Sequence, residues 1–270
     1  MDIEAEFQKL GKTPAVRLKA MMARLRDPEN GCPWDVEQTF KTIAPYTIEE
    51  AYEVSQAIDN NDLGELKEEL GDLLLQVVFH AQMASELGEF TYDEVSDAIV
   101  RKMISRHPHV FGDVHERNAI EQTVAWEETK AQERKLKGQD SQKSILDGVA
   151  AALPALMRAE KLQKRAARVG FDWPNAQQVI DKITEEANEL VEARDNGESQ
   201  ERIHEEMGDL LFAVTNLARK LGVDPEHALR DTNLKFTKRF TYIEDNSKGA
   251  LNEMSLDDME SLWQQAKGKV

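Results

Sequence analysis

The stretch DLGELKEELGDLLLQVVFHAQMASEL, residues 62–87, places apolar side chains at three- and four-residue intervals over most of its length. Successive residues of an α-helix advance by about 100°, so this spacing gathers them on one broad face of a helix. Residues 196–221, NGESQERIHEEMGDLLFAVTNLARKL, repeat the arrangement. The two predicted stripes are Leu66, Leu70, Leu73, Leu74, Val77 and Val78, and Ile203, Met207, Leu210, Leu211 and Val214.

The rest of the chain follows the same helical pattern. Apolar residues recur at three- and four-residue spacing in nearly every segment, and β-branched residues rarely alternate with polar ones. Glycine and proline are sparse, at 14 and 8 of 270 residues. The sequence therefore predicts an all-α protein, and its length favours two domains.

A long internal repeat supports two domains. GCPWD, with Trp34, matches GFDWP, with Trp173, and EELGDLLLQVV matches EEMGDLLFAVT. A period this long indicates a duplicated domain rather than a solenoid. Further matching pairs are Lys102 and Arg106 with Lys235 and Arg239, and Trp126 and Lys130 with Trp263 and Lys267.

The polar segment KGQDSQKS, Lys137–Ser144, contains no apolar residue and is predicted to be a linker or surface loop. We therefore expect an N-terminal repeat over residues 1–137 and a C-terminal repeat over residues 144–270.

Composition excludes several classes of protein. The net charge of −17, from 51 acids against 34 bases, disfavours binding to nucleic acids or anionic membranes. No apolar run approaches the roughly 20 residues needed to span a bilayer, because Gln76 and His80 interrupt the longest one. The single cysteine, Cys32, and a start without signal-peptide features favour the cytoplasm.

Each repeat carries a cluster of acids on two consecutive predicted helices. TIEEAYEV, Thr47–Val54, holds Glu49, Glu50 and Glu53 within one arc of a helix, and ITEEANELVEA repeats this pattern. If each pair of helices packs antiparallel, four carboxylates converge in each repeat. The expected sets are Glu50, Glu53, Glu69 and Asp72, and Glu186, Glu189, Glu206 and Asp209.

Converging carboxylates repel one another unless a cation lies among them, and an all-oxygen set favours Mg²⁺, with Mn²⁺ as the alternative. The competing interpretation is a solvated acidic surface, in which Thr47 and Glu50 would form a helix capping box. Against it, Thr184 of the second repeat has Ala187 at the capping-box position, yet the acids remain.

Gly71 and Gly208 lie inside the predicted helices, beside the acids, where glycine costs up to about 1 kcal/mol relative to alanine. Either the close approach of a neighbouring helix or ligand, or tight helix packing alone, would explain them.

Carboxylate-bound Mg²⁺ usually also binds substrate phosphates, so a polyphosphate is the expected ligand. Cations are available to neutralise its remaining charge: Lys235 and Arg239 share a helical face, and Lys102 and Arg106 repeat that spacing. An ordinary basic surface turn is the alternative interpretation of each pair.

The chain resembles the MazG family of nucleoside triphosphate pyrophosphohydrolases, all-α proteins, over both repeats. The motifs that carry the resemblance are CPWD, IAPYTIEEAYEV, EELGDLLLQVVFHAQMA, RHPHVFG, LPALMRAEKLQKRAARVGFDW, EEANEL and EEMGDLLFAVTNLARKLG. The resemblance implies binding of nucleoside triphosphates, ATP included, and cleavage between the α and β phosphates to a monophosphate and pyrophosphate. It also implies Mg²⁺ and a homodimer that completes the site.

The resemblance further implies roles for individual residues. Glu185 or Glu186 would position the attacking water or take its proton. Glu186, Glu189, Glu206 and Asp209 would bind the metal. The substrate would contact Lys182, Glu185, Arg202, Lys235, Arg239 and Trp263. Arg202 departs from the family pattern, which has lysine at that position.

The two repeats differ in charge at two positions. The second repeat has Lys182 and Arg202 where the first has Tyr46 and Glu65. A cation beside phosphate contributes on the order of 1–3 kcal/mol, so we predict that the C-terminal repeat is catalytic. The first repeat would be structural, a metal-binding relic, a weak second site or a regulatory nucleotide site.

Two rival functions belong to other classes. A di-metal carboxylate oxidase needs Glu-x-x-His pairs, and only Glu201 and His204 have that spacing in the aligned helices. A nucleotide or alarmone sensor that binds without cleaving stays open, and so does the preferred base or sugar. His107 and His109 could bind metal, although a proline-fixed loop is favoured.

Overall fold

The computed structural model describes residues 2–112, 144–247 and 249–269, and these residues form helices without any strand. This confirms the all-α prediction. The chain divides into two units, Met1–Arg134 and Lys135–Val270. Most of the linker predicted at Lys137–Ser144, and the pair Trp126 and Lys130, lie outside the described residues.

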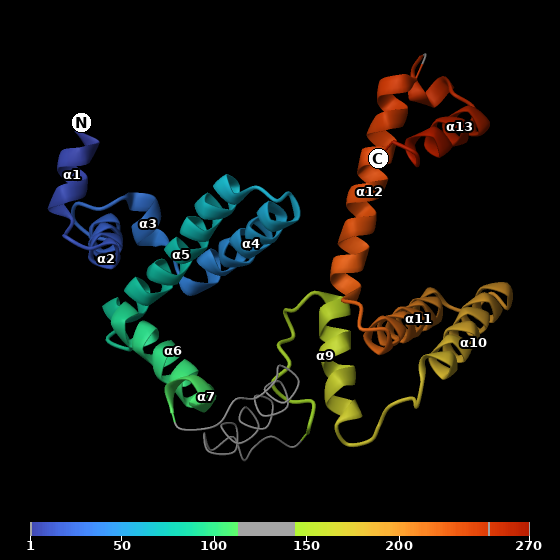
Figure 1. Ribbon diagram of the computed structural model, residues 1–270, viewed down its shortest axis with the longest axis horizontal. Coiled ribbons are helices and arrows are strands. Elements are labelled where there is room, and N and C mark those ends of the chain that lie inside the picture. Colours follow the sequence, from blue (N-terminus) through green and yellow to red (C-terminus); the bar gives the residue numbers. More distant parts are fainter. Residues whose placement is uncertain (1, 113–143, 248, 270) are drawn as a thin grey trace. The chain divides into compact units, whose positions relative to one another are not determined.

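The described part of the first unit contains seven helices (Figure 1). They are α1 (Ile3–Lys9), α2 (Pro14–Leu25), α3 (Pro33–Glu37), α4 (Phe40–Asp59), α5 (Leu63–Glu86), α6 (Tyr92–Arg106) and α7 (Pro108–Phe111). The segment around His107 and His109, which was predicted to be a loop, forms the short helix α7.

The described part of the second unit has five α-helices and one short 3₁₀ turn (Figure 1). They are α9 (Ala155–Ala167), α10 (Ala176–Asp195), α11 (Gln200–Lys220), α12 (Pro225–Asn246), η1 (Leu251–Glu253) and α13 (Leu256–Ala266).

A long helical hairpin is the main feature of each unit. Helices α4 and α5 pack along each other across a short turn in which Asn61 adopts a left-handed φ of 55°, and α10 and α11 do the same across a turn with Gly197 at φ 67°. Asparagine and glycine tolerate this conformation better than other residues, which allows the chain to reverse within a few residues. The hairpins bring the acid-bearing helices together.

The core of the first unit forms where α2 and α4 pack on α5. Met22, Ile43, Val78, Phe79 and Met83 form its buried apolar cluster, each 4% exposed or less. This packing fixes the buried face of α5, and with it the direction of the acids on that helix. None of the described helices is both long and apolar enough to cross a membrane.

His80 joins the two helices of the first hairpin. Its Nε2 lies 3.1 Å from Thr47 Oγ1, and its ring stacks on Phe40 with centroids 5.8 Å apart. Burial lowers the pKa of His80 below its ordinary value. The folded state then binds fewer protons than the unfolded state as pH falls below about 6.5. Stability contributed by neutral His80 is complete above that pH and is lost on acidification.

We therefore expect His80→Gln to flatten the acid-side loss of stability of the first unit. The measurement is the thermal unfolding midpoint at pH 7.5, 6.5 and 5.5. His204→Gln, at an exposed position on α11, is the matched control and should retain the slope. An equal slope for His80→Gln and the unmodified protein would contradict this assignment.

Candidate active site

Three acids of the second repeat meet between α10 and α11. Carboxylate oxygens of Glu186, Glu206 and Asp209 all lie within 4.8 Å of one another. Glu186 and Glu206 are only 6% and 2% exposed, whereas Asp209 is exposed. Buried carboxylates are costly unless they are paired or bound to metal, so Glu186 and Glu206 require positively charged partners.

Glu189, the fourth predicted acid, lies outside that group of three and is exposed. It still acts on the cluster. Burial raises the pKa of Glu206, the positive charge of Arg202 opposes this rise, and the negative charges of Glu189, Glu186 and Asp209 add to it.

Two basic side chains are paired with the buried acids. Lys182 Nζ lies 2.7 Å from Glu186 Oε1 and 2.8 Å from Glu185 Oε1. Arg202 forms an ion pair with Glu206 through Nη2 and contacts Glu205 at 3.2 Å through Nη1. Hydrogen bonds to Glu185 and then to Glu186 raise the pKa of Lys182 above its ordinary value. Both residues therefore carry their positive charge at the edge of the cluster.

The first repeat forms an equivalent cluster between α4 and α5. Oxygens of Glu50, Glu69 and Asp72 lie within 4.8 Å of one another, and Glu53 is outside the group of three. Burial, followed by the charges of Asp72 and Glu53, raises the pKa of Glu50. Burial and the charges of Glu53 and Asp72 do the same for Glu69.

The first cluster lacks the cations of the second. Tyr46 occupies the position of Lys182 and packs edge-on against Trp34, with ring centroids 6.2 Å apart. Glu65, at the position of Arg202, accepts a hydrogen bond from Asn60. The charge difference predicted from the sequence is therefore present beside the acids themselves.

Gln76 is a further neighbour of the first cluster and was not among the predicted site residues. It is 8% exposed, and its Nε2 donates to Glu50 Oε1 at 3.4 Å. The signal for it was the interruption of the apolar run on α5. The matching residue of the second repeat is Ala213, which offers no polar group.

The remaining predicted substrate residues lie on α12 and α13. Arg239 lies over the Trp263 ring, 5.6 Å from its centroid, and Lys235 is exposed on the same helix. Within the described ranges, no ion pair connects Lys235 or Arg239 to the acids. Figure 1 shows α13 beside α12 and α10 beside α11. The basic pair thus lies on α12, outside the α10–α11 hairpin that carries the acidic cluster.

The capping-box interpretation of Glu50 is wrong. Helix α4 begins at Phe40, and its capping box is formed by Thr39 and Thr42. Thr47 lies well inside the helix, where its hydroxyl donates to the Ile43 carbonyl at 3.4 Å. Capping therefore does not account for Glu50.

Tight packing against a neighbouring helix does not explain the helical glycines among the described residues, and the approach of a ligand stays a prediction. A Cβ added at Gly71 or Gly208 would meet no heavy atom within 4 Å beyond its own local helix. Gly208 instead lines a hollow that it shares with residues of α9, such as Leu156 and Ala159.

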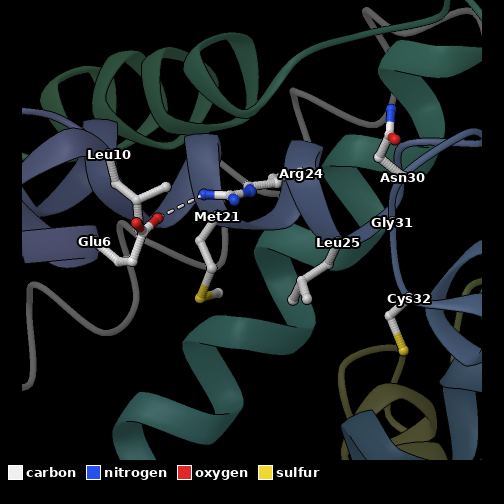
Figure 2. A pocket seen from close by; sticks show the side chains of 8 residues that line it. All are labelled: Glu6, Leu10, Met21, Arg24, Leu25, Asn30, Gly31 and Cys32. Carbon is white, nitrogen blue, oxygen red and sulfur yellow. Dashed lines mark hydrogen bonds and ion pairs between the residues drawn. The ribbon is translucent and has the colours of Figure 1, made fainter. Parts of the chain in front are cut away.

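A separate hollow of about 420 Å³ lies on α1, α2 and the loop before α3 (Figure 2). Glu6 and Arg24 face each other across part of it with an ion pair of 3.0 Å, and the Cys32 side chain lies at another side. It is lined mainly by apolar surface and includes none of the clustered acids. The acids on the hairpins remain the candidate site.

Each acidic cluster suits a hard divalent cation. Three carboxylate oxygens within 4.8 Å of one another, from two helices and without sulfur or imidazole, match the ligand preference of Mg²⁺ or Mn²⁺. The residues present therefore fit the predicted metal. In the second repeat, the adjoining Lys182 and Arg202 would also suit an anionic ligand.

Comparison with known proteins gives matches over both repeats. The model of the MazG nucleotide pyrophosphohydrolase domain matches residues 38–111 and again residues 175–243. The chain is 52% identical over 255 residues to the nucleoside triphosphate pyrophosphohydrolase of Escherichia coli (strain K12), covering 93% of this chain and 96% of that protein. It is 44% identical over 254 residues to the nucleoside triphosphate pyrophosphohydrolase/pyrophosphatase MazG of Thermotoga maritima, covering 93% and 94%. It is also 44% identical over 252 residues to the uncharacterized protein YabN of Bacillus subtilis, covering 92% of this chain and 50% of that protein.

Proposed function

The chain belongs to the MazG nucleotide pyrophosphohydrolase family, and from this premise we propose that its second repeat is the working site of a nucleoside triphosphate pyrophosphohydrolase. The reaction divides a nucleoside triphosphate between the α and β phosphates into a monophosphate and pyrophosphate. The observation that carries the proposal is the meeting of three carboxylates and two cations at one corner of the α10–α11 hairpin. Such an enzyme would cleanse or regulate the nucleotide pool.

Glu186, Glu206 and Asp209 would hold the metal, with Glu189 nearby as a fourth acid. A bound Mg²⁺ or Mn²⁺ would offset phosphate charge and lower the pKa of an attacking water. Glu185 is the better candidate for taking a proton from that water, because it is 55% exposed and lies outside the metal-binding group. Direct attack by water needs no covalent intermediate on the protein.

Lys182 and Arg202 would bind the triphosphate oxygens. Charge-assisted hydrogen bonds of this kind contribute about 1–3 kcal/mol each, and they hold the phosphate chain against the acids that would otherwise repel it. Tyr46 and Glu65 give the first repeat neither contact. The first repeat is accordingly proposed to be structural, or a weak second site built on Glu50, Glu53, Glu69 and Asp72.

A homodimer would bring further groups to the substrate. Apolar side chains of α11 that one chain leaves uncovered include Met207, Leu211 and Val214, each 43–50% exposed. An apolar face of this kind on a helical hairpin favours packing against a second copy. Lys235, Arg239 and Trp263 would then contact the nucleotide, from the same chain or from its partner.

The net charge of −17 supports a protein without nucleic-acid or anionic-membrane partners. The single cysteine, Cys32, supports a place in the reducing cytoplasm. The substrate base is left open, because the acids and cations at the site recognise phosphate and metal.

The test is a product analysis with Mg²⁺ and a panel of canonical and modified nucleoside triphosphates. We expect monophosphate and pyrophosphate in a 1:1 ratio, no turnover in EDTA, and recovery on adding Mg²⁺ or Mn²⁺. Release of orthophosphate in place of pyrophosphate would contradict the assigned bond. Binding without any product would favour the sensor.

A further inference from the structure

We propose that Lys182 and Arg202 are removable counter-ions that make the binding of metal and triphosphate to the second repeat interdependent. This inference rests on the proposed function of that repeat. It adds a coupling between the two ligands: without nucleotide the two cations pair with the carboxylates, and a bound triphosphate takes the cations as its own partners.

The geometry places one cation on each buried acid. Lys182 lies 2.7 Å from Glu186, and Arg202 is paired with Glu206. These are the two buried members of the three-acid group, since Asp209 is exposed. A divalent cation that enters the group must therefore take over oxygens that already have a positively charged partner.

The same cations can leave without losing every partner. The side chains of Lys182 and Arg202 are 32% and 49% exposed, so both have room to move. Each also contacts an exposed acid, Glu185 for Lys182 and Glu205 for Arg202. Exposed pairs contribute little, about 0–1 kcal/mol, so these acids alone do not draw the cations off the buried carboxylates.

A triphosphate changes that balance because it offers several charged oxygens to the same two side chains. Once Lys182 and Arg202 bind phosphate, Glu186 and Glu206 lose their internal counter-ions and bind a divalent cation more tightly. Linkage is reciprocal, so bound metal must strengthen triphosphate binding by the same factor. Coupling of this kind between two sites is typically about 5- to 150-fold in affinity.

The first repeat lacks these two counter-ions. Tyr46 and Glu65 stand at the two cation positions, and Glu50, Glu69 and Asp72 still converge. Metal bound to the first repeat, if any, would therefore show no such dependence on triphosphate. The contrast arises from two positions of the sequence.

The experiment measures Mn²⁺ affinity in the full chain by electron paramagnetic resonance of free Mn²⁺, with and without a non-hydrolysable α,β-methylene triphosphate. Glu50→Gln and Asp72→Asn silence the first cluster in every variant, so that the second repeat is observed. We expect Lys182→Met or Arg202→Met to tighten Mn²⁺ binding without nucleotide by roughly tenfold, and to reduce the tightening caused by the analogue. Arg194→Met, which removes the same charge from α10 away from the cluster, should change neither.

Unchanged or weaker Mn²⁺ binding by both Lys182→Met and Arg202→Met without nucleotide would overturn the proposal. Pyrophosphate release by the unmodified chain distinguishes a failure of the counter-ion mechanism from a failure of the proposed function. If the unmodified chain releases pyrophosphate but Lys182→Met and Arg202→Met leave the Mn²⁺ affinity unchanged, only the counter-ion mechanism is wrong. With no turnover and no binding of the analogue, the proposed function itself fails.

Discussion

Glu206→Gln is expected to reduce pyrophosphate release by at least roughly 10²-fold, whereas Glu69→Gln leaves it within about twofold. Glu206 is 2% exposed, belongs to the three-acid group and pairs with Arg202. Replacing it with an amide of the same size removes one negative charge from the proposed metal site and a partner of the nearby cation. The measurement is steady-state pyrophosphate release at saturating Mg²⁺.

Glu69 provides a closely matched control. It occupies the same place in the first repeat, on α5 in the sequence EELGD, and its carboxylate belongs to the equivalent group of three. The two variants differ only in which repeat loses its acid. A loss of about half in each variant would assign turnover to both repeats, and a large loss confined to Glu69→Gln would place the working site in the first. Far-ultraviolet circular dichroism establishes that each variant is folded.

The acid clusters could be predicted because their geometry is local. Glu69 and Asp72 lie at i, i+3 on one helix, and a short turn brings that helix back along its predecessor. Periodicity and turn length are therefore enough to bring Glu50 to the same place. They did not show that Glu53 lies outside the group of three acids that meet within 4.8 Å. Membership of that group depends on side-chain direction and burial.

The periodicity of apolar residues could not predict features that depend on long-range packing. It identified the apolar stripe on α11 but did not show that Met207 and Leu211 stay 43% and 50% exposed within one chain. The competing interpretation placed a helix cap at Thr47, although the helix begins at Phe40, upstream of Pro45. Proline within an otherwise helical pattern usually ends or kinks a helix, and here the helix continues through it.

The role of Asp172 could not be predicted from the sequence, because its partners are 47 and 48 residues away. It lies in the segment before α10 and binds the end of α11: Arg219 donates to one of its oxygens, and Lys220 Nζ lies 2.6 Å from the other. Its side chain is 20% exposed, and those of Arg219 and Lys220 are 10% and 16% exposed. Burial favours the neutral acid, but the hydrogen bonds from Arg219 and Lys220 outweigh it and hold the pKa of Asp172 below its ordinary value.

Asp172→Ala is therefore expected to destabilise the second unit by about 3–5 kcal/mol, because it leaves two largely buried cations without their acid. The cost of an unpaired buried charge exceeds the net contribution of the original pair, so the loss is larger than the ion pair alone would suggest. Urea unfolding of the full chain measures it. Hydrogen exchange followed by mass spectrometry should localise the weakened protection to the end of α11.

Asp195→Ala tests whether burial is the cause. Asp195 also pairs with an arginine, Arg194, at 2.7 Å, but the two side chains are 61% and 65% exposed. Exposed pairs contribute about 0–1 kcal/mol, so this variant should unfold close to the unmodified protein. A similar small effect for Asp172→Ala would mean that water reaches Arg219 and Lys220 once the acid is gone. In that case the contact would orient the start of α10 against α11 without adding appreciably to the stability of the unit.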